Sequence, residues 1–264
     1  MRMYLRELKT NIKSLLIWTV VIAFLIIVAI GKFAAFEGNP ESLAILDTMP
    51  PQLLEALGMR AFNLTTVEGF FGAMFTYFVI IGAMAAALWG VEVISKEERD
   101  RTVEFTLVLP ISRQKIVTSK LLAALTNCTL FVLFTWLISI FAVQTYQPDK
   151  AFYDFLRLEM LAMFLVEMVF QGFGLMLGCI SKSPRKVGSL AIGVILGLYF
   201  LSIIAGMNEK LEWLKWLTPF GWFNASQFFR NGHLEPLSYV LSAVVVMVFL
   251  FIGYSNYNNR DLYI

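Results

Sequence analysis

The sequence has little charge, one histidine and two cysteines. Charged residues make up 15% of the 264 positions, hydrophobic residues make up 58%, and the mean hydropathy is +0.71. Soluble domains contain about 25% charged and about 45–50% apolar residues. A chain with so few charges lacks the polar side chains to cover a soluble fold. The composition therefore excludes a soluble enzyme, an intrinsically disordered chain and collagen, and it indicates a membrane protein.

The scarcity of histidine and cysteine excludes the common metal sites. His233 has no cysteine or carboxylate companion in a metal-binding pattern. Cys128 and Cys179 both fall within apolar runs, where cysteine is usually a small packing residue, and neither belongs to a CxxC motif. The net charge of +2 is too balanced for a protein that binds nucleic acid. We therefore expect no metal site and no nucleic-acid partner.

Proline is absent from the long apolar runs, and these runs predict six membrane-spanning helices. All eight prolines lie between the runs, as expected because proline removes a backbone donor that lipid cannot replace. Each run has about 20 residues, which is enough for one crossing of the hydrocarbon core. The predicted spans are 15–35, 69–91, 121–143, 160–180, 187–206 and 237–254.

Basic residues are distributed unequally between the two sides of the predicted bundle. Six spans place both ends of the chain on one side, and that side holds 14 of the 21 Lys and Arg residues. Because cytoplasmic loops carry the excess of Lys and Arg, we expect a multi-pass protein of the cell membrane with both termini in the cytoplasm. Residues 1–14 predict an amphipathic helix in the cytoplasmic interface. The alternative is a basic flank that only sets the topology.

Two segments between the spans are longer than a simple connection requires. Residues 92–120 begin with a dense run of charges and continue through Pro110 to Ser112, a predicted N-cap. We interpret them as two helical segments around a turn, suited to docking a cytoplasmic partner. Residues 207–236 are rich in Trp and Phe but are broken by a proline and a glycine. They predict short re-entrant helices at the outer interface or, alternatively, an ordinary interfacial loop.

The predicted spans also contain polar and small residues in helical register. Glu167 and Gln171 lie four apart, on one face of the fourth span. An ionisable group at membrane depth costs several kcal/mol and usually faces a cavity or a partner. Glu167 could therefore line a translocation path or make an interhelical contact. Small residues at helix-packing spacing are Gly82, Ala86 and Gly90, then Gly174 and Gly178, and then Ser189, Gly193 and Gly197.

Residues 90–120 resemble the ABC-2 class of ABC-transporter permeases. The shared pattern is G-x-E-x-I-x-x-E-x-x-x-x-T-x-E-x-x-L-x-x-P-x-S-R-x-x-I-x-x-x-K. It is carried by Gly90, Glu92, Ile94, Glu97 or Glu98, Thr102, Glu104, Leu107, Pro110, Ser112, Arg113, Ile116 and Lys120. The basic amphipathic start, the six spans and the C-terminal run Asn259-Arg260-Asp261-Leu262 extend the resemblance over the chain. Arg101 departs from the pattern, because the family usually has glycine before the threonine.

The resemblance implies a single all-α transmembrane domain, residues 1–264, acting as the membrane subunit of a type V-like ABC exporter. Two copies of a cytoplasmic ATP-binding subunit would bind ATP and Mg, and a second copy of this chain or a similar permease would complete the complex. The chain itself has no G-x-x-x-x-G-K-[ST] loop, so we expect no cofactor and no catalysis on it. The cargo would be an amphipathic or hydrophobic peptide, drug or lipid. The alternatives are a secondary transporter and a membrane anchor or sensor for a cytoplasmic protein.

The resemblance also assigns roles to particular residues. A coupling helix between the second and third spans would contact the ATP-binding subunit, and short re-entrant helices would precede the last span. The implied coupling residues are Glu92, Lys96, Glu98, Arg101, Thr102, Glu104 and Arg113. The loop 181–186 would form a second, smaller contact. From the residues alone, Glu167 and Gln171 are the candidates for a translocation path.

Overall fold

Six long helices dominate the structure, which is a computed structural model. It describes residues 2–39, 62–100, 112–207 and 209–259, together with Pro50, Leu54, Met59 and Thr102. The helices that are long and apolar enough to cross a membrane are α1 (Arg2–Phe33), α4 (Val67–Arg99), α6 (Arg113–Val143), α7 (Lys150–Ile180), α8 (Val187–Met207) and α11 (Pro236–Asn259). The all-α membrane fold with six candidate spans is confirmed.

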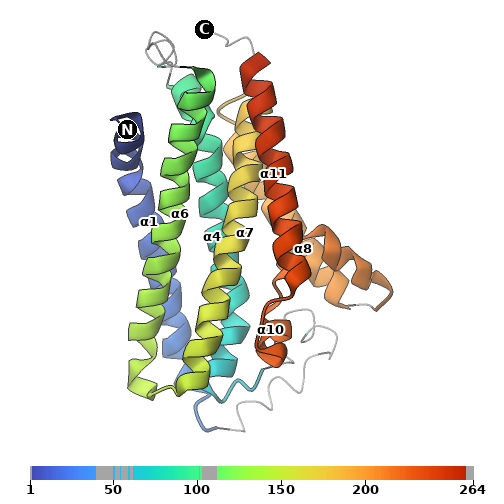
Figure 1. Ribbon diagram of the computed structural model, residues 1–264. Coiled ribbons are helices and arrows are strands. Elements are labelled where there is room, and N and C mark those ends of the chain that lie inside the picture. The colour runs from blue at the N-terminus through green and yellow to red at the C-terminus, as the bar shows by residue number, and fades with distance from the viewer. Residues whose placement is uncertain are drawn as a thin grey trace.

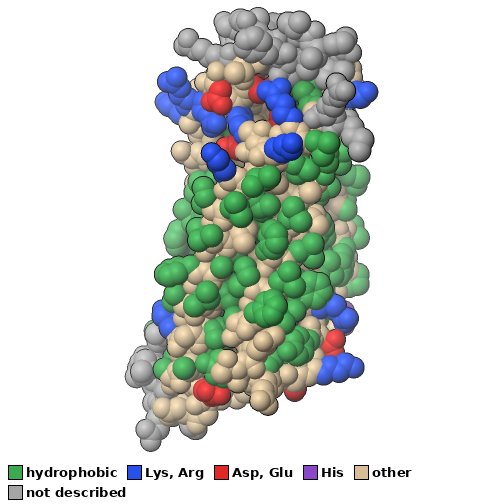
Figure 2. Space-filling model, turned by 90° about the vertical axis from the view of Figure 1, so that its left-hand side faces the viewer, with side chains coloured by type: hydrophobic (Ala, Val, Ile, Leu, Met, Phe, Trp, Pro, Cys, Tyr) green, Lys and Arg blue, Asp and Glu red, His purple; other side chains and the backbone are tan. Residues whose placement is uncertain are grey.

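The start of α1 and the end of α11 lie at the same end of the bundle, here named the termini-side end (Figure 1). Figure 2 shows the face on which α1 and α6 lie, with an apolar belt between two ends that carry the charged side chains. Lys and Arg gather above this belt, at the termini-side end. Exposed apolar side chains such as Ile17, Phe24 and Phe141 belong to the belt, which is the surface that a lipid bilayer covers.

The helices extend beyond the predicted apolar spans. Residues 2–14 do not form a helix of their own, because α1 runs without a break from Arg2 to Phe33 and contains no proline and no glycine before Gly31. The predicted N-cap at Ser112 is confirmed, since its Oγ accepts a hydrogen bond from the backbone N–H of Lys115 at 3.4 Å. The helical segment after the turn is therefore the first part of α6. Likewise α7 begins at Lys150, ten residues before the predicted start of its span.

Glycines allow α4 and α7 to pack backbone against backbone at the centre of the bundle. A Cβ atom at Gly174 would collide with the backbone carbonyl of Ala87, and one at Gly90 would collide with the carbonyl of Gln171. These small residues were predicted at helix-packing positions, and the close approach explains why only glycine fits there. The third predicted stripe is different, because a Cβ at Gly193 or Gly197 on α8 would meet nothing within 4 Å. Among the described residues, nothing packs against those two glycine positions.

Short helices fill the segment 207–236, as the sequence predicted. They are η4 (Glu209–Leu217), which packs along α8, α9 (Pro219–Trp222) and α10 (Ala225–Asn231). Thr218 and Asn224 cap α9 and α10, and Gly232 ends α10 with a φ of 69°, a left-handed conformation that glycine adopts easily. The position of these helices in the outer leaflet stays a prediction.

Candidate functional site

A buried ion pair joins α4 to α6 at the termini-side end. Nζ of Lys120 lies 2.9 Å from Oε1 of Glu97 and donates a hydrogen bond to the carbonyl of Val93 at 3.1 Å. The Lys120 side chain is only 3% exposed and that of Glu97 is 14% exposed. An ammonium group removed from water needs such partners, because its desolvation costs several kcal/mol. The pair therefore fixes the ends of α4 and α6 relative to each other.

Two of the predicted coupling residues tie further helices to this end. Lys96 on α4 donates to Oδ1 of Asn11 on α1 at 3.4 Å. Nη1 of Arg113, the first residue of α6, donates to the carbonyls of Tyr257 and Asn258 at 3.4 Å each. These carbonyls belong to the last turn of α11, where a cation also interacts favourably with the helix dipole. Lys96 and Arg113 thus link α1, α4, α6 and α11, and their contact with an ATP-binding subunit stays a prediction.

Some of the remaining predicted coupling residues are half-buried, and others lie outside the described residues. Glu92, Glu98 and Thr102 are half-buried, and the backbone N–H of Thr102 bonds to the carbonyl of Glu97, so the chain turns back over the end of α4. Arg101 and Glu104 lie outside the described residues. Arg99, Asp100 and Lys115 are exposed charges next to this turn, and the sequence alone suggested no role for them.

The ABC-2-like pattern therefore separates into two groups of residues. Gly90, Ile94, Ile116 and Lys120 are buried and hold α4, α6 and α7 together. The half-buried and exposed members lie on the surface of the termini-side end. Sequence reasoning missed the Lys120–Glu97 pair, although both positions belong to the pattern, because a spacing of 23 residues across an undefined turn does not show which charges meet.

A second cluster of polar side chains lies inside the bundle. Glu167 on α7 is 0% exposed and lies against Gly82 of α4, where a Cβ would lie 2.7 Å from Oε1 of Glu167. The thiol of Cys128 on α6 faces the same carboxyl group. A thiol is a weak donor, and the described residues supply no conventional hydrogen-bond partner for either oxygen. Glu167 is thus enclosed between α4, α6 and α7 of a single chain.

Glu167 belongs to a polar row along one face of α7. Glu159 precedes it by eight residues and is also 0% exposed, while Gln171 follows by four residues and is 3% exposed. Across the interface, Nδ2 of Asn127 on α6 has no partner among the described residues, and the same holds for Nε2 of Gln171. Glu159 was not predicted because the fourth span was predicted to begin at residue 160, one position later. Glu159 lies eight residues before Glu167, and this spacing places both carboxyl groups on one face of a helix. That spacing could have predicted it. A place on a translocation path stays a prediction for Glu167 and Gln171.

Comparison with known families matches residues 1–262 to the model described as "ABC-2 family transporter protein". The chain belongs to the ABC-2 transporter family. A search among curated proteins returned no match. Membership in the ABC-2 family, with six apolar helices, makes the chain a multi-pass membrane protein and a permease-type transmembrane subunit of an ABC transporter. Permeases of this family are generally not catalytic themselves and typically work with an ATP-binding subunit.

Proposed function

We propose that this ABC-2 permease is the transmembrane subunit of an ATP-driven exporter that moves an amphipathic or hydrophobic cargo out of the cell. Two copies of a separate cytoplasmic subunit supply ATP binding and hydrolysis, and this chain holds neither ATP nor Mg. The family match over residues 1–262 is the observation that carries the proposal. The gathering of Lys and Arg at the termini-side end supports placing that end in the cytoplasm (Figure 2).

The termini-side end has the construction that a mechanical coupling requires. α4 and α6 each continue without a break from the middle of the bundle to this end, and the Lys120–Glu97 pair locks them together. A movement imposed on the turn between them is therefore carried into α4, and from α4 into α7 through the glycine contacts. A partner does work on such an element only if it binds two of its states with different affinity. The proposed contact residues are Glu92, Lys96, Glu98, Arg101, Thr102, Glu104 and Arg113, with residues 181–186 as a second contact.

A second permease subunit completes the proposed complex. Six spans are half of the number that the resemblance implies for a whole transporter, and the chain leaves large apolar surfaces uncovered. In an apolar stretch of 18 residues in α8, only 17% of the residues are buried within the chain, and the same share holds for α11. We propose either a homodimer or a pair with a similar permease. A cargo that enters between two such subunits meets an apolar and aromatic surface, which suits a peptide, drug or lipid with a substantial apolar part.

Charge reversal at the coupling surface tests the proposal. The chain is co-purified with its candidate ATP-binding subunit, as wild type and with Glu98→Lys and Glu104→Lys combined. We expect the double variant to lose most of the bound subunit, or to keep it while ATP hydrolysis no longer depends on the permease, because opposite charges at a docking surface become like charges. The matched control, Glu37→Lys with Asp154→Lys, reverses two exposed charges remote from that surface. Unchanged assembly and unchanged coupling in the Glu98/Glu104 variant would refute the assignment.

A further inference from the structure

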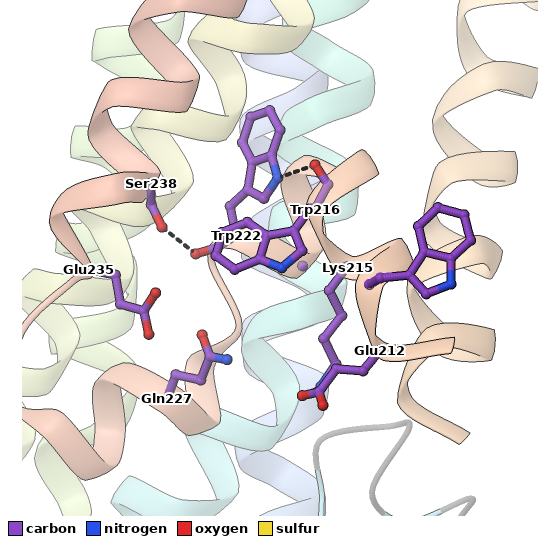
Figure 3. Close-up of a pocket in the computed structure, with 9 residues that line it drawn as sticks. Glu212, Lys215, Trp216, Trp222, Gln227, Glu235 and Ser238 are labelled. Carbon is purple, nitrogen blue, oxygen red and sulfur yellow. Dashed lines mark hydrogen bonds and ion pairs between the residues drawn. The ribbon is translucent and has the colours of Figure 1, made fainter. Parts of the chain in front are cut away.

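A pocket of about 430 Å³ lies beside the start of α11, away from the termini-side end. η4, α9, α10 and the first turn of α11 contribute its walls, so four successive elements fold around one space (Figure 3). Its volume is within the range of about 300–1,000 Å³ that small-molecule sites occupy. Three of the six tryptophans of the chain line it, namely Trp213, Trp216 and Trp222.

The inner wall of the pocket is fixed by two hydrogen bonds. Nε1 of Trp222 donates to the carbonyl of Trp216 at 2.8 Å, and Oγ of Ser238 donates to the carbonyl of Trp222 at 2.8 Å (Figure 3). Trp222 is 9% exposed and Ser238 is 1% exposed, so the bond between them is buried, and the bond to Trp216 is partly buried. The rim is open by comparison, because Trp213 is 59% exposed and Trp216 is 50% exposed. A fixed inner wall and an open aromatic rim form a site that exists before a ligand arrives.

The charges of the pocket leave one carboxylate without a counter-ion. Glu212 and Lys215 form an ion pair at 3.0 Å and neutralise each other. Glu235 lines the opposite side, and its carboxylate makes no hydrogen bond or ion pair with the residues that the structure describes. Figure 3 shows the side chains of Glu235 and Gln227 turned toward the same space. The pocket thus combines one net negative charge with three indole rings.

We propose that this pocket binds the ammonium group of an amphipathic organic cation. The indole ring is the aromatic group that attracts cations most strongly, and a carboxylate at the same site adds direct charge pairing. An anionic head group would meet Glu235 with no unpaired cation to balance it. A divalent metal needs several oxygen ligands, which one unpaired carboxylate does not provide. The apolar part of the ligand lies along the exposed rim, where Trp213 and Leu217 face outward.

The proposal is independent of the exporter assignment, because it requires neither an ATP-binding subunit nor a direction of transport. It is tested on the full chain alone, in nanodiscs made of phosphatidylglycerol. Octyltrimethylammonium is titrated while tryptophan fluorescence is recorded, since half of the tryptophans line the pocket. We expect a saturable change that Glu235→Gln weakens by roughly three- to tenfold. The control Glu37→Gln removes an exposed carboxylate outside the pocket and should leave the binding curve unchanged.

Two further measurements test the role of an indole ring and the role of the charge on the ligand. Trp216→Leu removes an indole ring of the lining from a residue that is 50% exposed, so the fold tolerates it, and we expect affinity to fall by about two- to fivefold. Octyl glucoside has the same tail without the charge and should displace the cation poorly. Equal binding by wild type and Glu235→Gln, or displacement by octyl glucoside as effective as by the cation, would overturn the assignment.

The same titration in phosphatidylcholine nanodiscs distinguishes two sources of the ammonium group. The surface charge of the bilayer changes probe binding to wild type and to Glu235→Gln equally, so the ratio of the two affinities is compared. A smaller ratio in phosphatidylcholine would show that the lipid headgroup occupies the pocket. An unchanged ratio would identify a free amphiphile as the occupant. Either result is in agreement with an ammonium site. If Glu235→Gln does not alter probe binding in either lipid, the proposal is wrong.

Discussion

The α4–α7 pair and the two helices α8 and α11 show opposite relations between apolar composition and burial. α8 and α11 are the more apolar on average, yet only 17% of each apolar window is buried, compared with 78% for α4 and 61% for α7. The less apolar helices form the centre because the centre is where glycines, Glu167, Gln171 and the Lys120–Glu97 pair meet their neighbours. α8 also carries glycines, but a Cβ at Gly193 or Gly197 would meet nothing within 4 Å.

This difference shows what drives helix association in this protein. In a bilayer, lipid tails solvate leucine and valine side chains as well as a protein does, so apolar side chains give helices little reason to associate. Small residues that admit close backbone contact, and polar groups that must avoid lipid, supply the reason instead. Hydropathy therefore finds the spans, and small or polar residues determine which of them are central.

The largest loss of stability is expected from breaking the Lys120–Glu97 ion pair, which joins α4 to α6. Lys120→Met removes the ammonium group that pairs with Glu97, in a site where the Lys120 side chain is 3% exposed, and we expect a loss of about 3–5 kcal/mol in the free energy of unfolding. Adding Glu97→Gln should restore part of that loss, because the carboxylate that Lys120 paired with is then neutral. Thermal unfolding of the detergent-solubilised chain measures both variants. Lys115→Met, an exposed lysine on the same helix, is the control, and an equal loss in that control would disprove the importance of the pair.

A smaller effect on stability is expected from adding one methyl group, either at the central α4–α7 contact or on the outer helix α8. Gly174→Ala forces α4 and α7 apart at the backbone of Ala87, and we expect destabilisation by about 1–3 kcal/mol. Gly193→Ala adds the same methyl group to the open face of α8 and should be neutral or stabilising by up to about 1 kcal/mol, because alanine favours the helix. Unfolding of both variants under the same conditions tests the pair. Similar losses in the two would break the distinction between the central and the outer helices.

The smallest change in stability is expected from Glu167→Gln, which keeps the volume of the side chain. The carboxyl oxygens of Glu167 have no conventional partner among the described residues, so we expect a shift below about 1 kcal/mol. If Glu167 serves transport, ATP hydrolysis by the reconstituted complex should fall several-fold in this variant. Glu159→Gln, a buried carboxyl on the same face of α7, is the matched control. Unchanged hydrolysis in Glu167→Gln would leave Glu167 with a packing role only.

Much of the fold could be predicted from the sequence, and the failures have identifiable causes. The six apolar runs, the Ser112 cap and the short helices of 207–236 follow from local signals, namely run length, capping and breaks at proline and glycine. Helix ends were placed too close to the apolar runs, since α7 begins at Lys150 and α1 continues through the basic start. Charged residues end a hydrophobic run without ending a helix, because the helix goes on making its own backbone hydrogen bonds in water or at the interface.

The candidate site was predicted less completely than the fold. The ABC-2 pattern indicated residues 90–120, but its members proved to be of two kinds, with Lys120 buried against Glu97 and Arg113 bonded to the end of α11. Glu159 and the pocket around Glu235 were not predicted at all. Glu159 is buried by other helices of the bundle, and the pocket depends on how several short helices fold against one another. Hydrophobic periodicity reports only neighbours on the same helix.

The sequence by itself determined that this chain resides in a membrane, how many times it can cross, and to which family it belongs. These properties depend on local composition and on a short pattern, and lipid rewards an apolar run of sufficient length wherever it occurs. The tertiary structure alone decided which helices are central, which charges pair and which tryptophans surround a pocket. Those outcomes depend on backbone approach at a few glycines and on partners for buried polar groups, and both arise only when distant segments meet.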